Sequence, residues 1–224
     1  MTILSNEELI RRVPLFASLS PAQAAMVAGS VVKRRFKRGE CLVQQGQKSG
    51  YLAILLTGRA RVVATDGKKR EVILARLEPG DHVGEMSLID DQPHSASVIA
   101  EVQTDVLTLG RAEFAACLPE SSAMAFAIMK GLVRRLREAD YKIESLALLD
   151  VYGRVARALT ELSNPLETGG RLSYAKVSRQ DVAKMIGASR EMVSRVMKEF
   201  EKSGYIETRP DGLMVVKERL YLSY

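Results

Sequence analysis

The order of apolar and polar positions divides the chain into three zones with different periodicities. In residues 31–109, short runs of β-branched and apolar residues alternate with glycine-containing turns. Such runs are typical of strands, and their close spacing favours an antiparallel β-roll or jelly roll over βαβ units. Residues 5–28, which precede this zone, have a helical pattern with breaks near Pro14 and Pro21. The turns are expected at Gly39, Gly46, Gly58, Gly67 and Gly80.

The second zone, residues 118–148, has a helical period and no internal Gly-Pro cluster. Its apolar residues recur at alternating spacings of four and three, the a/d pattern of a helix that packs along a partner helix. This seam predicts that the helix pairs with a second copy of the chain in a homodimer. The alternative is a single amphipathic helix that lies on its own β-roll. The seam consists of Ala125, Met129, Leu132, Leu136, Ala139, Ile143 and Leu146.

The third zone contains the pattern of two helices joined by a glycine turn. Ser178, with Asp181 three residues later, predicts a capping box that opens the first helix, and Gly187 supplies the left-handed residue that ends it. Ser189 then caps a second helix with an apolar face of its own. Two helices with a turn of this length are typical of a helix-turn-helix that binds DNA. The alternative is a structural helical hairpin with a charged outer face.

These zones together predict an α+β protein. Asp150 is suited to end the long helix and to cap the next one, which is expected to run from Val151 to about Ser163. The hairpin 206–216, with its turn at 209–212, would form a wing behind the helix-turn-helix. The expected domains are a sensor-like antiparallel β-roll at 1–117, a dimerisation helix with hinge at 118–150, and a winged helix-turn-helix at 151–224.

The second helix of the predicted helix-turn-helix presents polar side chains on the face opposite its apolar residues. Those near its N-terminus are placed to enter a major groove, where arginine bonds guanine in two places and glutamate accepts from cytosine. Other side chains of the motif are placed to hold phosphates, which sets the register without reading bases. The base-reading set is Arg190, Glu191, Ser194 and Arg195 beside the cap Ser189, and the phosphate set is Arg179, Gln180 and Lys198.

Composition limits the functional classes that remain. The chain has 224 residues, a net charge of +6 and 46% hydrophobic residues, which excludes a disordered protein. Its apolar runs are far shorter than the roughly 18 residues of a membrane span, and the N-terminus lacks the basic segment of a secretory signal. Two cysteines imply no disulfide framework, so we expect a cytoplasmic protein. A basic stretch after residue 171 fits a nucleic-acid footprint or a solvated helix face.

Three stretches resemble the CRP/FNR family of transcription regulators: GDHVGEMSLIDDQPHSASV, LALLDVYGRVARAL and SREMVSRVMK. The resemblance covers the chain from about Leu15 to Val216. It implies a cyclic-nucleotide-binding-type β-roll, a homodimer, double-stranded DNA with a palindromic operator, and RNA polymerase as a further partner. It also implies that Arg190, Glu191 and Arg195 read a GTGA half-site. Ser194 resembles the family members that read thymine-containing half-sites instead.

The same resemblance implies an effector site in the first of these stretches. Gly84, Glu85, Met86 and Ser87 would hold a cyclic phosphate with backbone N–H groups, and Glu85 would take the ribose 2′-hydroxyl. The chain departs from the cAMP-binding members at four positions. His94 and Ser95 stand where an arginine–serine pair holds the phosphate, and a neutral imidazole offers no permanent charge there. Ala139 and Asp140 stand where two hydroxyl residues touch adenine.

Three interpretations of the effector site remain open. The pocket binds cAMP or cGMP weakly, it binds another messenger such as cyclic di-GMP, or it is vestigial and the regulator is effector-independent. A cyclic dinucleotide carries two phosphates, for which several arginines are available, although a solvated surface explains them equally well. These arginines are Arg59, Arg61, Arg76, Arg134, Arg135 and Arg137.

Other classes of protein find little support in the residues. Two cysteines cannot supply the four thiolates of an iron–sulfur cluster, and His82 and His94 are poorly placed as haem ligands. We expect no metal ion, and we interpret Cys41 and Cys117 as small core residues. The chain has no GxSxG, Walker or HExxH motif, so we expect it not to be an enzyme. A nucleotide-binding regulatory subunit of another protein would not need the helix-turn-helix.

Overall fold

The computed structural model describes residues 6–16, 19–120, 122–162, 164–165, 172–174, 178–209 and 214–216. The chain divides into two compact units, Met1–Arg137 and Glu138–Tyr224. The division between them falls inside the predicted dimerisation helix 118–150, and each unit is described on its own.

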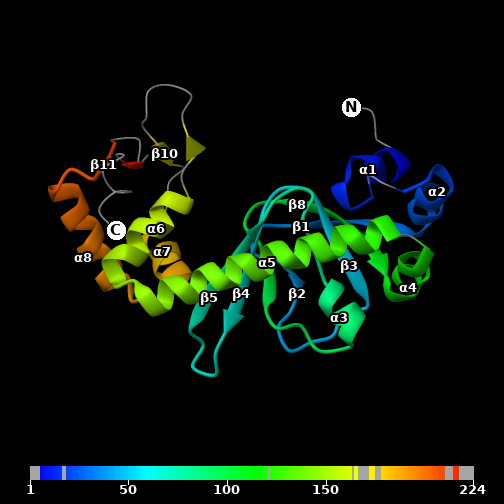
Figure 1. The fold of residues 1–224 in the computed structure, drawn as a ribbon, viewed down its shortest axis with the longest axis horizontal. Coiled ribbons are helices and arrows are strands. Elements are labelled where there is room, and N and C mark those ends of the chain that lie inside the picture. The colour runs from blue at the N-terminus through cyan, green and yellow to red at the C-terminus, as the bar shows by residue number, and fades with distance from the viewer. Residues whose placement is uncertain are drawn as a thin grey trace. The chain divides into compact units, whose positions relative to one another are not determined.

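The first unit is built on two four-stranded antiparallel sheets, which confirms the predicted α+β class and β-roll architecture. One sheet has the strand order β1-β8-β3-β6 and the other β2-β7-β4-β5. The strands are β1 (Val31–Phe36), β2 (Cys41–Val43), β3 (Tyr51–Thr57), β4 (Ala60–Thr65), β5 (Glu71–Leu77), β6 (His82–Val83), β7 (Ser97–Ala100) and β8 (Thr104–Gly110) (Figure 1).

Helices cover one face of the first of these sheets, and the side chains along its strands alternate between two hydrophobic cores. In β3, Leu52 and Ile54 pack with the N-terminal helices, whereas Ala53 and Leu55 pack between the sheets. This division follows from the two-residue period of a strand, which sends neighbouring side chains to opposite faces. The helices of this unit are α1 (Asn6–Arg12), η1 (Pro14–Phe16), α2 (Pro21–Ser30), α3 (Glu85–Asp90), α4 (Arg111–Glu120) and the first part of α5 (Ser122–Leu148).

Both prolines that break the N-terminal helical pattern begin an element. Pro14 opens η1, and Pro21 opens α2 directly after the cap Ser20, whose side chain and Gln23 form a capping box. Proline suits the first position of a helix because its missing N–H would have no intrahelical partner there. The helical expectation for residues 5–28 is thus confirmed for the described part, with the breaks where the prolines predict them.

The long helix α5 is continuous from Ser122 to Leu148, as the central zone of the sequence predicts (Figure 1). Met124 and Ile128 bury one side of its first half in the core of the β-roll unit. The predicted seam lies largely outside that core: Leu136 is 62% exposed and Ile143 64% exposed. The helix therefore packs on its own β-roll and, along a separate stripe, leaves apolar side chains uncovered in the single chain.

The described residues of the second unit form three helices and a small antiparallel sheet in addition to the end of α5. Its core is formed by α6, α7 and α8 around Leu159, Val182, Val196 and Phe200. The sheet has the order β11-β12-β10-β9, so the predicted hairpin is part of a larger sheet. The elements are α6 (Val151–Glu161), β9 (Asn164–Pro165), β10 (Leu172–Tyr174), α7 (Arg179–Ile186), α8 (Arg190–Lys202), β11 (Ile206–Thr208) and β12 (Met214–Val216).

Two sequence interpretations have a different outcome in the structure. Cys41, expected in the core, is exposed, because it stands at the first position of the short strand β2 with its side chain on the outer face. The side chain of Cys117 lies outside the described residues. Within the described part of the chain, no helix has the length and apolar character needed to cross a membrane.

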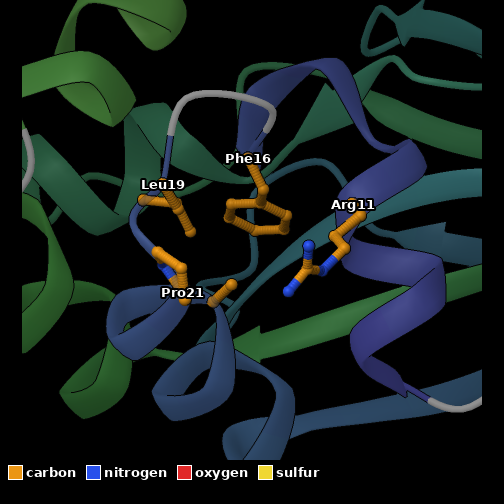
Figure 2. A pocket seen from close by; sticks show the side chains of 5 residues that line it. Arg11, Phe16, Leu19 and Pro21 are labelled. Carbon is orange, nitrogen blue, oxygen red and sulfur yellow. The ribbon is translucent and has the colours of Figure 1, made fainter.

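A cavity of about 240 Å³ lies among the N-terminal helices (Figure 2). Its charged lining residue, Arg11, points toward Phe16 and pairs with Glu7 one turn earlier at 2.9 Å. The remaining lining is formed by Leu19, Pro21 and Ala24. The pocket thus has mostly apolar walls, and its charged lining residue is already paired.

The turn at Gly58 yields a stability prediction. Gly58 has φ 84°, and a Cβ there would lie 2.5 Å from the carbonyl oxygen of Gln103. We expect Gly58→Ala to lower the free energy of unfolding by about 3 kcal/mol, because strain adds to the left-handed backbone cost. Gly39→Ala is the matched control: Gly39 has φ 87° but open space around it, and we expect a loss of about 1 kcal/mol. Urea unfolding measures both, and equal losses would contradict the role of the close contact.

Candidate functional site

The helix-turn-helix is set by local caps at each end of its first helix. The Ser178 hydroxyl accepts from the backbone N–H of Asp181 at 3.0 Å and opens α7. Gly187 ends α7 in the left-handed region at φ 65°, as its position in the sequence predicts. The Ser189 hydroxyl accepts from the N–H of Met192 at 3.2 Å and opens α8 two residues after that turn.

The apolar and polar faces of α8 are cleanly separated. Val193, Val196, Met197 and Phe200 are buried in the core of the unit. The polar residues of the predicted base-reading and phosphate sets lie at the start of α7 and along α8, and none of them is buried. Within the described part of the chain, no salt bridge involves any of them, so their charged groups are available to a partner. They are Arg179, Gln180, Ser189, Arg190, Glu191, Ser194, Arg195 and Lys198.

The predicted wing is partly described. β11 and β12 pair antiparallel, with Ile206 opposite Val216 and Thr208 opposite Met214. The residues of the expected turn after Arg209 lie outside the described part of the chain. β12 also pairs with β10, which ties this hairpin to the segment that precedes α7.

The predicted effector stretch begins at a glycine that allows close backbone approach. Gly84 has φ 96° and precedes α3, and a Cβ there would lie 2.6 Å from the carbonyl oxygen of Tyr51. Only glycine fits such a position without displacement. Directly after it, Glu85 is fully buried and Ser87 nearly so, whereas Met86 is exposed.

Glu85 is paired with an arginine from the long helix. Nη1 of Arg135 donates to Oε1 of Glu85 at 2.5 Å, and Nη2 of Arg135 donates to the carbonyl oxygen of His82. Arg134, the preceding residue, donates to Oδ1 of Asp81 at 2.6 Å. Burial raises the pKa of Glu85, and the positive charge of Arg135 offsets part of that rise. Two ion pairs therefore join α5 to the segment that leads into α3.

His82 lies close against the same helix. A Cβ at position 131 would lie 2.9 Å from Cε1 of His82, so Gly131 makes room for the imidazole. Burial, together with the charge of Arg135, lowers the pKa of His82 to about 4, and the ring is neutral at pH 7. A buried neutral imidazole beside two arginines avoids adding a third positive charge to this part of the helix.

Four polar side-chain atoms around this stretch are shut off from solvent and have no hydrogen-bond partner among the described residues. They are Nε2 of His82, Oε2 of Glu85, Oγ of Ser87 and Nε2 of His94. Buried polar atoms are normally satisfied, so such a group indicates a site that takes water or a polar ligand.

His94 and Ser95 lie in the loop between α3 and β7. The loop is anchored by backbone hydrogen bonds in both directions: the N–H of His94 donates to the carbonyl of Gln47, and Gly46 donates to the carbonyl of His94. Burial lowers the pKa of His94, so its imidazole is neutral at pH 7. Ser95 is exposed.

Within the first unit, part of the expected effector set lies together. Gly84, Glu85 and Ser87 share the start of α3. Ala139 and Asp140 are exposed on α5 and belong to the second unit, whereas the other expected residues belong to the first. From the sequence, Arg135 was only one of several arginines that could hold a cyclic dinucleotide. Its pairing with Glu85 joins residues 50 positions apart, and no local pattern signals such a contact.

Both units match models of known protein domains. The model of the cyclic nucleotide-binding domain matches residues 33–121, and that of the Crp-like helix-turn-helix domain matches residues 153–223. The cyclic AMP receptor protein of Thermus thermophilus is 32% identical over 209 residues, covering 93% of this chain and 94% of that protein. The cAMP-activated global transcriptional regulator Vfr of Pseudomonas aeruginosa is 30% identical over 193 residues, covering 84% and 90%.

The chain belongs to the CRP/FNR family of transcription regulators. Among solved structures, the c-di-GMP responsive regulator CLP of Xanthomonas campestris has a TM-score of 0.77 and 26% identity, covering 88% of this chain and 99% of that chain. CRP/FNR proteins are DNA-binding regulators and not enzymes, which confirms the expectation drawn from the missing catalytic motifs. The cyclic-nucleotide-binding fold, the helix-turn-helix and the resemblance stated from the sequence are likewise confirmed.

The Glu85–Arg135 pair of this CRP/FNR protein yields a prediction about pH. In Arg135→Met, the buried carboxylate keeps no cation, and we expect the free energy of unfolding to fall by about 3 kcal/mol at pH 8. The unfolded chain ionises Glu85 at a lower pH than the folded protein does. The loss relative to wild type should therefore be smaller at pH 5 and grow as the pH rises.

The control is the double variant Glu85→Gln with Arg135→Met, in which no carboxylate remains to ionise. Its stability difference from wild type should vary less between pH 5 and pH 8 than that of the single variant. Urea unfolding at both pH values measures all three proteins. A single variant whose loss is the same at both values would show that Arg135 does not neutralise Glu85.

Proposed function

We propose that this CRP/FNR regulator is a homodimer that reads a palindromic operator, with α8 of each subunit in a major groove. The observation that carries the proposal is the outer face of α8, where Arg190, Glu191 and Arg195 are exposed and form no salt bridge within the described residues. Side chains that read bases must be free in the unbound protein, because a paired arginine would have to give up its partner first. The N-terminal part of α8 carries all three.

Base reading is assigned by chemistry. An arginine offers two parallel donors to O6 and N7 of guanine, and a glutamate accepts from N4 of cytosine. We assign these roles to Arg190, Arg195 and Glu191 on a GTGA-like half-site, with Ser194 between them. We assign phosphate contacts to Arg179, Gln180 and Lys198, which lie at the start of α7 and along α8 and fix the register.

The exposed seam of α5 supports the homodimer. Met129, Leu136, Ile143 and Leu146 are each more than half exposed and follow the a/d spacing along one stripe. A stripe of this length with coiled-coil spacing is buried when a second helix packs along it. Two subunits joined in this way would place their recognition helices about one turn of DNA, roughly 34 Å, apart.

A small effector in the β-roll is supported by the unsatisfied polar atoms around Glu85. Both a cyclic mononucleotide and a cyclic dinucleotide agree with relatives: two curated proteins of the family are named for cAMP, and CLP is named for c-di-GMP. The ion pair between Arg135 and Glu85 favours the second candidate, an effector-independent regulator with a vestigial pocket, because the buried carboxylate already has a cation. We further propose a cytoplasmic location, because the proposed target is DNA, and RNA polymerase as a further partner, as the family resemblance implies.

The experiment that tests the proposal is DNA binding measured by fluorescence anisotropy at fixed salt. The probes are a TGTGA-N6-TCACA duplex, the same duplex with one half-site scrambled, and a fully scrambled duplex. We expect the intact palindrome to bind most tightly, since only a dimer gains from two half-sites. Equal affinity for the three duplexes would contradict sequence-specific reading by a dimer.

The same titration identifies the effector. cAMP, cGMP and cyclic di-GMP are added separately, each at fixed protein concentration. A change in operator affinity with one of them names the effector, and specific binding that none of them alters establishes the effector-independent regulator. Fluorescence-detected binding of each nucleotide to the protein alone separates a ligand that binds silently from one that does not bind.

Two arginines of the DNA-binding unit are expected to behave differently. Arg190→Ala should lower affinity for the operator by about 1–3 kcal/mol and relax specificity at one guanine, since it removes a base contact. Arg179→Ala should lower affinity for operator and random DNA alike. It should also reduce the slope of log affinity against log salt concentration by about one, because one fewer counterion is released. Anisotropy at several salt concentrations measures both variants. If Arg190→Ala weakened operator and random DNA equally, its assignment to base reading would be wrong.

A further inference from the structure

An arginine of α6 contacts the turn that precedes the recognition helix. Nη1 of Arg154 donates to the carbonyl oxygen of Ile186 at 3.0 Å. Ile186 is the last residue of α7, and the left-handed residue Gly187 follows it. The contact thus reaches from the beginning of α6 to a point three residues before Ser189, the cap of α8.

This carbonyl needs a donor from outside its own helix. The last carbonyls of a helix have no intrahelical partner. At the end of α7, the N–H groups of Gly187 and Ala188 both return to the carbonyl of Ala183. The carbonyl of Ile186 is thereby left to the guanidinium of Arg154. A cation at the C-terminus of a helix also complements the helix dipole, and a hydrogen bond from a charged donor is stronger than a neutral one.

A second polar contact ties α6 to the recognition helix itself. The hydroxyl of Tyr152 donates to Oε2 of Glu199 on α8 at 2.5 Å, and its ring meets Phe200 edge-on. α6 therefore holds α8 through Tyr152 and holds the turn in front of α8 through Arg154. An apolar core alone allows helices to slide or rotate slightly, whereas polar contacts at both places set the direction of α8.

We propose that Arg154 is a positioning residue for base reading, which fixes the turn between α7 and α8 and so sets the angle at which the outer face of α8 enters the groove. The inference rests on the proposed function, since it presumes that α8 reads bases. Arg154 is half-buried and its Nε is shut off from solvent without a partner among the described residues. Its guanidinium therefore acts inside the unit, through Ile186, and not on a phosphate.

The test compares operator and random DNA. The operator is the duplex that the wild-type protein selects from a random library, and the variants are Arg154→Met and Arg154→Lys. Arg157→Met is the matched control: Arg157 is on the same helix but lies over the ring of Tyr141 and pairs with Glu161. Affinities for both DNAs are measured by anisotropy at several salt concentrations, and thermal unfolding reports the folded fraction of each protein.

For Arg154→Met we expect the ratio of operator to random affinity to fall about tenfold, because a misdirected α8 weakens roughly one bidentate base contact. The salt dependence should stay that of wild type, because no phosphate contact is lost. Lysine keeps one charged donor, so Arg154→Lys should have an intermediate ratio. Arg157→Met should keep the wild-type ratio.

The results that would overturn the inference can be told apart from one another. A fall in affinity for both DNAs with a weaker salt dependence would make Arg154 a phosphate contact and overturn the inference. An unchanged ratio in folded Arg154→Met would overturn it as well. If Arg154→Met does not fold, Arg154→Lys decides, and a wild-type ratio there overturns the inference. If the wild-type protein itself selects no sequence, the proposed function fails before Arg154 is tested.

Discussion

A fully buried carboxylate organises the first unit. Glu85 is shielded from solvent, and burial of a carboxylate is tolerated only when a cation and hydrogen bonds replace its contacts with water. The cation is Arg135, which comes from the long helix and also binds the carbonyl of His82. The position of α5 on the β-roll is therefore tied to the residue that the family resemblance assigns to an effector's ribose. If the proposed effector takes Glu85, it competes with the contact that anchors the helix, and that competition would link the pocket to the helix.

The second unit is organised by helix caps and not by a buried ion pair. Its helices begin at side-chain caps, Asp150, Ser178 and Ser189, each of which accepts from a backbone N–H three residues later. Caps decide where a helix starts, and the apolar core decides which face it buries. The direction of the helix needs further contacts, which α6 supplies through Tyr152 and Arg154. The exposed side chains near the start of α8, Arg190, Glu191 and Arg195, take no part in these contacts.

Most of the confirmed predictions rest on signals carried by a few neighbouring residues. Glycine turns and two-residue alternation predicted the antiparallel sheets, and serine and aspartate caps predicted helix starts that the structure confirms at Asp150, Ser178 and Ser189. The Glu85–Arg135 pair could not be predicted in this way, because it joins distant positions through tertiary packing. The exposure of Cys41 has the same origin. Cysteine is usually buried, but an edge position on a three-residue strand overrides that preference.

The uncovered seam of α5 has a consequence for how the protein responds to its own abundance. If a second copy covers the stripe, as proposed, the DNA-binding form is a product of two chains, so its amount rises with more than the first power of the chain concentration. Halving synthesis of the chain would then reduce operator occupancy by more than half whenever subunits are scarce. In the proposed dimer, the stripe from Met129 to Leu146, exposed in the single chain, would thereby convert a gradual change in expression into a sharper change in transcription.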